Sequence, residues 1–272
     1  MAEKVAGNDS NAKRVLVVGA LGRMGEQVRA QVAAHEELVL GAALERPGHP
    51  EVGRVLENEV AVTDDVKQAL AGCDVVIDFS IPTSTLANLH AAVDAGVAYV
   101  TGTTGFSAEE RGEIAAMAQR IPLVHAPNFS LAVNVLGWLS REASRRLGPA
   151  FDAELFEIHH SKKRDAPSGT ALFLAEAVAK GRGVKLEDKL VLERAGETGE
   201  RPDEAIGVQT LRGGDNPGEH TVMFVGSGER VELVHRSATR EHFASGAVRA
   251  AAWLAGHEPG LYPIEQVFGL DD

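Results

Sequence analysis

A glycine-rich turn near the N-terminus constrains the fold of this 272-residue chain more than any other feature. The β-branched run at residues 14–18 leads into Gly19-Ala20-Leu21-Gly22-Arg23-Met24-Gly25, a G-x-x-G-x-x-G variant of the strand-to-helix turn in dinucleotide-binding βαβ units. Glycines serve there for a tight turn, for close approach of the backbone to a pyrophosphate, and for close packing of helix on strand. The turn therefore predicts a Rossmann fold, although a tight turn in a flavodoxin-like fold also uses glycines.

The end of the second predicted strand bears on the choice of dinucleotide. Glu45 lies twenty residues beyond Gly25, where an acidic side chain accepts hydrogen bonds from the ribose hydroxyls of NADH. Arg46 follows directly, and a guanidinium in this place can pair with the 2′-phosphate of NADPH. The dipeptide leaves both NADH and NADPH open as cofactors.

The order of predicted elements indicates an α/β chain with two domains. Short β-branched runs alternate with amphipathic helices up to residue 126, as in βαβ units on a parallel sheet. We predict strands at 14–19, 38–44, 74–80, 98–102 and 122–126, and helices at 24–35, 64–70, 84–95 and 108–119. Beyond these lie a long helix at 131–147, a strand at 152–158, a helix at 169–180, three strands at 206–212, 219–225 and 230–236, and a last helix at 240–254. We expect the three later strands to be antiparallel, so that an α+β domain on a mostly antiparallel sheet follows the Rossmann domain.

Composition excludes several classes of protein. A formal charge of −12 repels phosphate backbones, so we expect no nucleic-acid partner. The single cysteine, Cys73, favours a reducing compartment, and we expect a cytoplasmic protein. No run is long enough to span a membrane, and the polar first dozen residues resemble a loose tail more than a signal peptide.

The segment at residues 157–171 combines the side chains that chemistry near neutral pH needs. His159 can supply a proton, and Lys163 can hold a positive charge beside it. Ser168, Gly169 and Thr170 open a predicted helix, whose free amides can bind a carboxylate. The alternative is a pair of surface histidines in a solvated basic run. A metal site is disfavoured because neighbouring strand residues point to opposite faces and no cysteine or third clustered histidine completes a ligand set.

Two further loops follow predicted strands at the edge where open α/β sheets bind ligands. They are Gly102-Thr103-Thr104-Gly105 and Ala126-Pro127-Asn128-Phe129. Both can line the nicotinamide end of a bound dinucleotide, and both are also common turn sequences.

With these motifs the chain resembles the bacterial dihydrodipicolinate (4-hydroxy-tetrahydrodipicolinate) reductase family of the diaminopimelate and lysine pathway. The resemblance covers nearly the whole chain. One matching segment is E-x-HH-x-x-K-x-DAPSGTA, which begins at Glu157, and the HH-x-x-K-x-DAPSGT string within it is the most specific. The other matching strings are VGALGRMG, the Glu45-Arg46 pair, GTTG, APNFS, and Arg212-x-Gly214-x-x-x-Gly218-Glu219-His220.

The resemblance assigns roles to these residues. It implies His159 as proton donor with Lys163 as its partner, and it implies His160, Lys163, Gly169 and Thr170 as ligands of the substrate's carboxylates. We add Ser168 to this substrate site because it opens the predicted helix. It implies cofactor contacts from Gly19, Ala20, Leu21, Gly22, Arg23, Met24, Glu45, Arg46, Gly102, Thr103, Thr104, Ala126, Pro127, Asn128 and Phe129. It also implies a homotetramer built through the sheet of the second domain, a cofactor domain at 1–130 with 240–272, and a substrate and oligomerisation domain at 131–239.

The reaction expected from the resemblance is hydride transfer to C4 of a small cyclic dicarboxylate while His159 protonates C3. Ile81 departs from the arginine that some members of the family carry after the third strand, which leaves cofactor preference open. A semialdehyde dehydrogenase would need a nucleophilic cysteine in the second domain, where the chain has none. A non-catalytic dinucleotide sensor is the other alternative, and it predicts no oxidation of the cofactor that depends on substrate.

Overall fold

The computed structural model describes residues 12–239 and 241–271, which divide into two compact units. The first unit contains residues 12–129 and 243–271, and the second contains residues 130–242. The expected polar tail at the N-terminus and the expected first residue of the last helix, Arg240, lie outside the described residues. The binding roles expected of the two domains stay predictions at this point.

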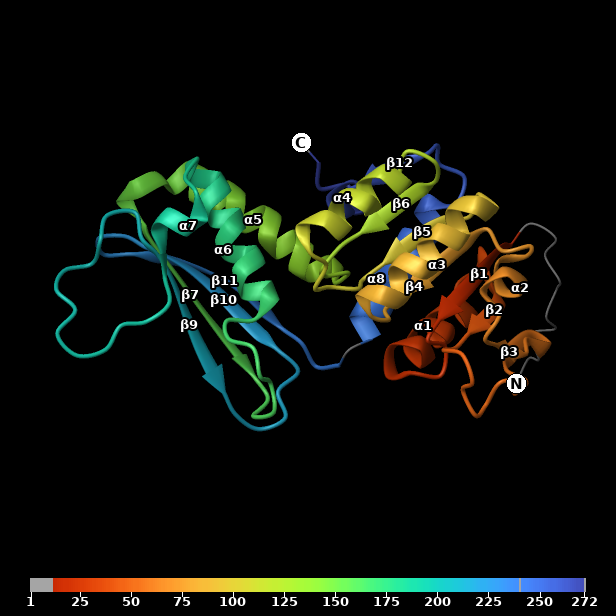
Figure 1. Ribbon diagram of the computed structural model, residues 1–272. Coiled ribbons are helices and arrows are strands. Elements are labelled where there is room, and N and C mark those ends of the chain that lie inside the picture. The colour runs from red at the N-terminus through yellow and green to blue at the C-terminus, as the bar shows by residue number, and fades with distance from the viewer. Residues whose placement is uncertain (1–11, 240, 272) are drawn as a thin grey trace, which may run out of the picture. The chain divides into compact units, whose positions relative to one another are not determined.

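The first unit is a parallel α/β sandwich, as the alternating elements predict (Figure 1). Its strands are β1 (Lys13–Val18), β2 (Leu38–Leu44), β3 (Val62–Thr63), β4 (Val75–Asp78), β5 (Ala98–Thr101), β6 (Pro122–His125) and β12 (Gly260–Tyr262). Its helices are α1 (Arg23–Ala33), α2 (Val66–Leu70), α3 (Pro82–Ala95), α4 (Ala108–Met117), α9 (Ile264–Phe268) and most of α8 (Glu241–Leu254), with a 3-10 turn at Glu57–Glu59. The seven strands have the order β12-β6-β5-β4-β1-β2-β3, and every pairing is parallel.

Side chains that alternate along each strand fill two separate cores. On β1, Val15 and Val17 point to a core closed by α1, α8 and α9. Leu16 and Val18 point to the opposite core, closed by α2, α3 and α4. Because successive residues of a strand face opposite sides of the sheet, a continuous apolar run is what a sheet covered on both faces requires.

The second unit has a five-stranded sheet that is mixed, and the expected mostly antiparallel sheet is wrong. Its elements are α5 (Leu131–Leu147), β7 (Asp152–His159), α6 (Gly169–Arg182), α7 (Leu186–Lys189), β8 (Leu190–Val191), β9 (Ile206–Arg212), β10 (Glu219–Val225) and β11 (Arg230–Arg236), with a 3-10 turn at Gly148–Ala150. The order is β11-β10-β7-β9-β8, with antiparallel pairs on one side of β7 and parallel pairs on the other.

The reason for the mixed sheet is the position of β7. The chain leaves β7, crosses through α6 and α7 to the edge strand β8, and then runs through residues 192–205 into β9, which lies between β8 and β7 and is parallel to both. The chain then reverses at residues 213–218, and β10 pairs with the other edge of β7. Strands β9 and β10 are therefore consecutive in sequence but not neighbours in the sheet.

Among the residues that the structure describes, helices cover only one face of this sheet. Helices α5 and α6 pack on the face that carries Leu155, Val208, Val222 and Phe224, where they form the core of the second unit. The opposite face carries residues of the other parity in each strand. Those residues include half-buried or exposed apolar side chains, namely Phe156, Ile158, Leu211, Met223, Val225 and Val234.

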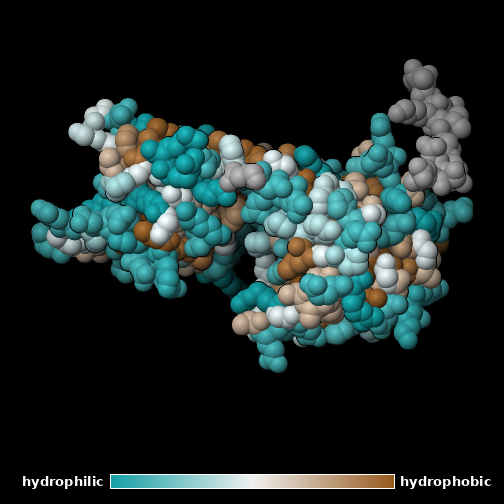
Figure 2. Space-filling model, turned by 90° about the horizontal axis from the view of Figure 1, so that it is seen from above, coloured by the Kyte–Doolittle hydropathy of each residue, from teal (hydrophilic) through white to brown (hydrophobic). Residues whose placement is uncertain are grey.

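The face of the molecule in Figure 2 is predominantly hydrophilic, with apolar side chains in scattered groups. Among residues 12–239 and 241–271, every helix is too short or too polar to cross a membrane.

Candidate functional site

The glycine turn of the first unit places α1 directly against the end of β1. Gly19 has a φ of +65°, and a Cβ added to Gly25 would lie 2.0 Å from the Gly19 carbonyl oxygen. Gly22 is the N-cap of α1, and Arg23 and Met24 are its first two residues. The turn therefore presents backbone N–H groups at a helix N-terminus, which is a favourable arrangement for a pyrophosphate.

Two charged side chains hold this turn in place. The Leu21 amide donates to Glu45 Oε1 over 2.8 Å, so this glutamate already supports the turn. Arg29, which is buried, donates from Nε to the Ala20 carbonyl over 2.9 Å and pairs with Glu57 at 2.5 Å. Glu45 thus has a role in the protein itself, beside the ribose contact predicted from sequence.

A cavity of about 590 Å³ opens at the carboxyl ends of β1, β2 and β4. Its lining includes Gly19, Glu45, Arg46, Ser80 and Ile81. Within the described part of the chain, the exposed guanidinium of Arg46 has no hydrogen-bond or ion-pair partner. Size and lining fit the adenosine end of a dinucleotide, because such ligands bind at the carboxyl ends of parallel strands.

The other two predicted cofactor loops are held by buried polar contacts. Thr103 is buried and accepts a hydrogen bond from the Thr85 hydroxyl at 2.8 Å, and its carbonyl accepts from His125 Nε2 at 3.1 Å. In the 126–129 loop, Ala126, Asn128 and Phe129 are buried. Gly102 is half-buried, whereas Thr104 and Pro127 are exposed. The loops therefore offer their exposed residues and backbone to a ligand, while the buried ones fix their course.

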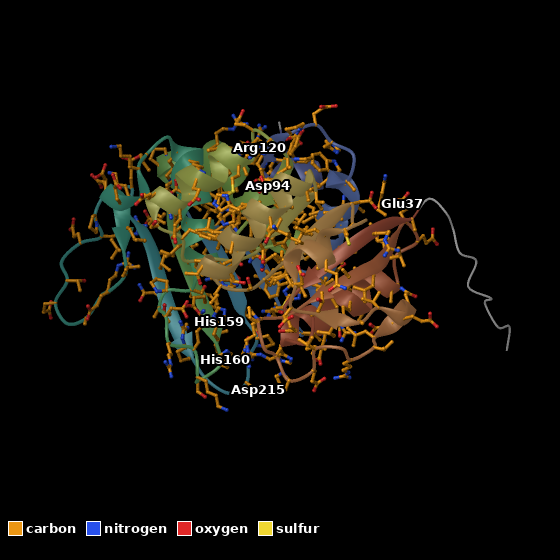
Figure 3. All side chains as sticks on the ribbon, turned by 45° about the vertical axis from the view of Figure 1, so that its right-hand side comes forward. Glu37, Asp94, Arg120, His159, His160 and Asp215 are labelled. Atoms are coloured by element: carbon orange, nitrogen blue, oxygen red, sulfur yellow. The ribbon has the colours of Figure 1, made fainter. Side chains whose placement is uncertain are left out.

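In the second unit, a row of polar side chains crosses the sheet on the face that the helices cover. Glu157 and His159 are two residues apart on β7 and point to the same side. The register places Thr210 of β9 and His220 of β10 on either side of Glu157, and it places Arg212 of β9 beside His159. Figure 3 shows His159 and His160 at this end of the sheet, with Asp215 in the loop between β9 and β10.

Glu157 is fully buried and accepts hydrogen bonds from four residues. They are His159 Nδ1 at 2.6 Å, Arg212 through both terminal nitrogens at 2.7 and 3.0 Å, the Ser168 amide at 3.0 Å, and the Thr210 hydroxyl at 3.3 Å. Burial raises the pKa of Glu157, but the bonds from Arg212, His159 and Ser168 outweigh it and lower the pKa below its usual range. The carboxylate is therefore ionised at neutral pH.

His159 is 8% exposed, and its Nε2 edge faces Gly218. Burial lowers the pKa of His159, and Glu157 opposes that effect through its hydrogen bond and its charge. The His220 ring lies edge-on to it, with ring centroids 5.2 Å apart. Burial, together with the nearby His159, lowers the pKa of His220 to about 3, so His220 is neutral.

The remaining predicted residues surround the start of α6. Ser168 is the N-cap of α6; its Oγ accepts from the Ala171 amide at 3.1 Å and lies 3.0 Å from His220 Nε2. Gly169 is exposed and Thr170 half-buried. Lys163 is 19% exposed and forms an ion pair with Asp165 at 2.7 Å. The His160 amide donates to the Asn216 carbonyl over 2.8 Å, which joins this segment to the β9–β10 loop.

Reasoning from sequence gave no role to Glu157, Arg212, Gly218 or His220, which all contact His159 or its partners. All four lie inside strings that carry the family resemblance, so the signal was present. Their function depends on the register between strands more than fifty residues apart, which no local pattern reveals. No group of three or more metal-ligating side chains suited to an ion occurs among the residues that the structure describes.

Comparison with known proteins agrees with the two-unit architecture. The family model for the N-terminus of dihydrodipicolinate reductase matches residues 13–129, and the model for its C-terminus matches residues 132–268. The chain is 52% identical over 261 residues to a 4-hydroxy-tetrahydrodipicolinate reductase of Anaeromyxobacter sp., which covers 94% of this chain and 97% of the relative. It is 49% identical to the same enzyme of Anaeromyxobacter dehalogenans, with 94% and 98% covered.

A solved structure is similar over nearly the whole chain. It is a dipicolinate-bound dihydrodipicolinate reductase from Paenisporosarcina sp. TG-14, with a TM-score of 0.77 and 25% sequence identity, covering 93% of this chain and 97% of that one.

Proposed function

The chain belongs to the dihydrodipicolinate reductase family, and we propose that its second unit binds the dicarboxylate substrate with His159 as the proton donor and Lys163 beside it. The family's reaction is the nicotinamide-dinucleotide-dependent reduction of 4-hydroxy-tetrahydrodipicolinate on the route to diaminopimelate and lysine. The observation that carries the residue assignment is the hydrogen bond between His159 Nδ1 and the buried Glu157, because it leaves Nε2 as the nitrogen that can face a ligand.

The dinucleotide would be held by the first unit and would supply the hydride. Its pyrophosphate would lie at the glycine turn, in contact with residues 19–24. The ribose and any 2′-phosphate would meet Glu45 and Arg46 in the 590 Å³ cavity. Gly102, Thr103, Thr104 and the loop 126–129 would line the other end. We propose activity with both NADH and NADPH, since the cavity offers a carboxylate and a guanidinium side by side.

The substrate would be held by the segment after β7 and the start of α6. Lys163 and His160 would bind one carboxylate by charge-assisted hydrogen bonds, and the free amides of α6 near Gly169 and Thr170 would bind the other. Ser168 supports this geometry, because it caps α6 and donates its own amide to Glu157. In the structure Lys163 forms an ion pair with Asp165, and a bound substrate carboxylate would replace Asp165 as the partner of Lys163.

The 4-hydroxyl of the substrate would first leave as water, together with a hydrogen from C3, and this forms a double bond between C3 and C4. The hydride would then add to C4 while His159 protonates C3. Its imidazolium would give the Nε2 proton and keep the Nδ1 hydrogen on Glu157. Lys163 would stabilise the negative charge that develops at the same time. General acids of this kind contribute about 10²–10⁴-fold to a rate.

A planar dicarboxylate tests the substrate assignment. Pyridine-2,6-dicarboxylate should inhibit competitively against the substrate, and pyridine-2-carboxylate, with one carboxylate, should inhibit far more weakly. That the similar structure is dipicolinate-bound supports this expectation. Because the binding is ionic in an otherwise acidic protein, added salt should weaken the inhibition.

Gly169→Ala sharpens this test. A Cβ at Gly169 meets no protein atom within 4 Å, so the variant should fold normally while its methyl group enters the ligand space. We expect it to weaken dicarboxylate inhibition. Gly112→Ala in α4 of the first unit is the matched control, since its Cβ also meets nothing within 4 Å. Equal inhibition by the mono-acid and di-acid, or equal effects of the two alanines, would contradict the proposed site.

We also propose a homotetramer formed through the open face of the second unit's sheet. Apolar side chains on this face remain exposed, including Leu211 at 46% and Val234 at 41%. Gln209 Nε2, on the same face, is buried without a hydrogen-bond partner among the described residues. A second copy of the chain would cover these groups.

We propose the cytoplasm as the location of the protein. The free, buried Cys73 is consistent with a reducing compartment of this kind.

A further inference from the structure

The buried carboxylate of Glu157 connects three parts of the second unit that are far apart in sequence. It accepts from His159 on its own strand, from Arg212 on β9 and from the Ser168 amide at the start of α6. A single ionised group therefore contacts the proposed acid and the helix start proposed to hold the substrate. The function proposed above uses it only as the acceptor of the His159 Nδ1 hydrogen.

The contact with His159 determines which imidazole nitrogen can act. An ionised carboxylate only accepts hydrogen bonds, so Nδ1 must carry the hydrogen in the 2.6 Å contact. The proton that leaves an imidazolium is then the one on Nε2. After transfer, the neutral ring keeps its Nδ1 hydrogen on Glu157, and Nε2 is the atom that takes up the next proton from water.

The surroundings of His159 Nε2 are consistent with proton transfer from this atom. A Cβ built on Gly218 would lie 2.7 Å from His159 Nε2, so the missing side chain leaves space beside that atom. On the other side of the carboxylate, Arg212 pairs with both oxygens of Glu157 and also donates to the Asp165 carbonyl at 2.6 Å. Arg212 thereby keeps Glu157 ionised and anchors the segment that carries Lys163.

We propose that Glu157 is the positioning residue of the active site, which fixes the tautomer and orientation of His159 so that Nε2 faces the substrate. The proposal rests on the function proposed above for His159. Glu157 itself touches no reacting atom, so its effect must pass through His159.

Glu157→Gln tests the proposal because it keeps the shape of the side chain and removes its charge. We expect kcat to fall about 10- to 100-fold, less than the 10²–10⁴-fold contribution of the general acid itself. The dissociation constant for NADH and the KM for substrate should change much less. Glu154→Gln is the matched control: Glu154 is also on β7 and pairs with Arg194 and Arg201 at 2.8 and 3.0 Å, but it lies on the opposite face.

The pH profile separates positioning from a merely structural role. The charged groups around His159 are Glu157 on its own strand, Lys163 after it and Arg212 on β9, and the neutral, titratable His220 of β10 also faces it. Of these, only Glu157 raises the pKa of His159. Its removal should lower that pKa further, so that the alkaline limb of the kcat profile, where His159 loses its proton, moves to lower pH. Glu154→Gln should leave this limb in place.

A double variant shows whether Glu157 acts through His159. In a His159→Gln background, Glu157→Gln should cause little further loss of kcat. A loss as large as in the wild-type background would overturn the positioning role alone, and so would an unshifted alkaline limb in the single variant. A His159→Gln enzyme with full kcat would instead overturn the proposed function together with this proposal.

Glu157→Asp keeps the test open if Glu157→Gln does not fold, because it retains the charge beside Arg212. In Glu157→Asp, we expect His159 to titrate in proton NMR at close to its wild-type pH. We expect kcat to fall, because the shorter side chain holds the imidazole in a different position. If His159 titrated at the same pH in the wild type, in Glu157→Asp and in the unfolded protein, the proposal would be overturned.

Discussion

At the scale of single residues, His159 and His220 have different roles because different groups surround the two imidazoles. Burial lowers the pKa of both. At His159, the hydrogen bond to Glu157 and its charge oppose burial, although the net effect still leaves the pKa below its usual value. At His220, the nearby His159 adds to the effect of burial, and the pKa falls to about 3. His220 is thus a neutral partner of Ser168, and His159 remains the group that can donate a proton.

Arg46 is the residue on which cofactor preference should depend. Its exposed guanidinium lines the same cavity as Ile81, and Ile81 offers no partner to a phosphate. We expect Arg46→Ala to lower kcat/KM for NADPH by a factor that corresponds to a free-energy loss of about 1.5–3 kcal/mol, the contribution of a hydrogen bond to a charged group. The kcat/KM for NADH should change much less. Arg54→Ala is the control, because Arg54 is also exposed and its ion pair with Glu51 lies outside the cavity. Equal losses with both cofactors would remove Arg46 from the site.

At the scale of elements, the insertion of β7 between β9 and β10 creates the site. It brings Glu157 and His159 of β7 between Arg212 on one neighbour and His220 on the other. Helix α6 begins ten residues after β7 ends, and the Ser168 amide at its start donates to Glu157, so the free amides of the helix lie at the same end of the sheet.

In the loop between β9 and β10, activity should tolerate substitution of Gly213 but not of Gly218. Gly218 has a φ of +146°, and its Cβ would contact His159 Nε2, whereas a Cβ at Gly213 meets nothing within 4 Å. We expect Gly218→Ala to lower kcat at least 10-fold by displacing the imidazole, consistent with the 10²–10⁴-fold range for losing a general acid. Gly213→Ala should keep near wild-type kcat. Steady-state kinetics on both variants decide, and equal activity would show that Gly218 is not required at His159.

Sequence patterns predicted the local features of the fold and missed those that depend on long-range pairing. The β-branched run before Gly19 predicted a strand from local chemistry alone, and that strand is present. Strands β3, β8 and β12 have two or three residues each, too few to show a period. The mixed sheet was missed because neighbouring strands in sequence usually pair, and only the three-dimensional register shows that β7 separates β9 from β10.

At the scale of the whole molecule, net charge and local charge oppose each other. The chain carries −12, yet the segment after β7 gathers His160, Lys162, Lys163 and Arg164 near the start of α6. A dianionic substrate must therefore be held by local donors against the field of the protein as a whole. This opposition explains why we expect binding of the substrate, and of its dicarboxylate mimics, to depend on salt.

The proposed tetramer gives a prediction at the same scale. Val234→Glu places a charge on the open sheet face and should shift sedimentation velocity from a tetramer to smaller species. Val52→Glu is the control, because Val52 is 42% exposed, close to the 41% of Val234, and lies in the first unit. A monomeric wild type, or a Val234→Glu protein that sediments like wild type, would contradict assembly through this face.

The most direct test of the account is the oxidation of NADH and NADPH, followed by absorbance, with enzymatically generated 4-hydroxy-tetrahydrodipicolinate and with wild type and His159→Gln compared. We predict substrate-dependent oxidation of both cofactors by wild type. In His159→Gln, kcat should fall about 10²–10⁴-fold while the dissociation constant for NADH stays unchanged. Absence of substrate-dependent oxidation would favour the sensing alternative, and a His159→Gln enzyme with full kcat and an unchanged pH profile would contradict His159 as the proton donor.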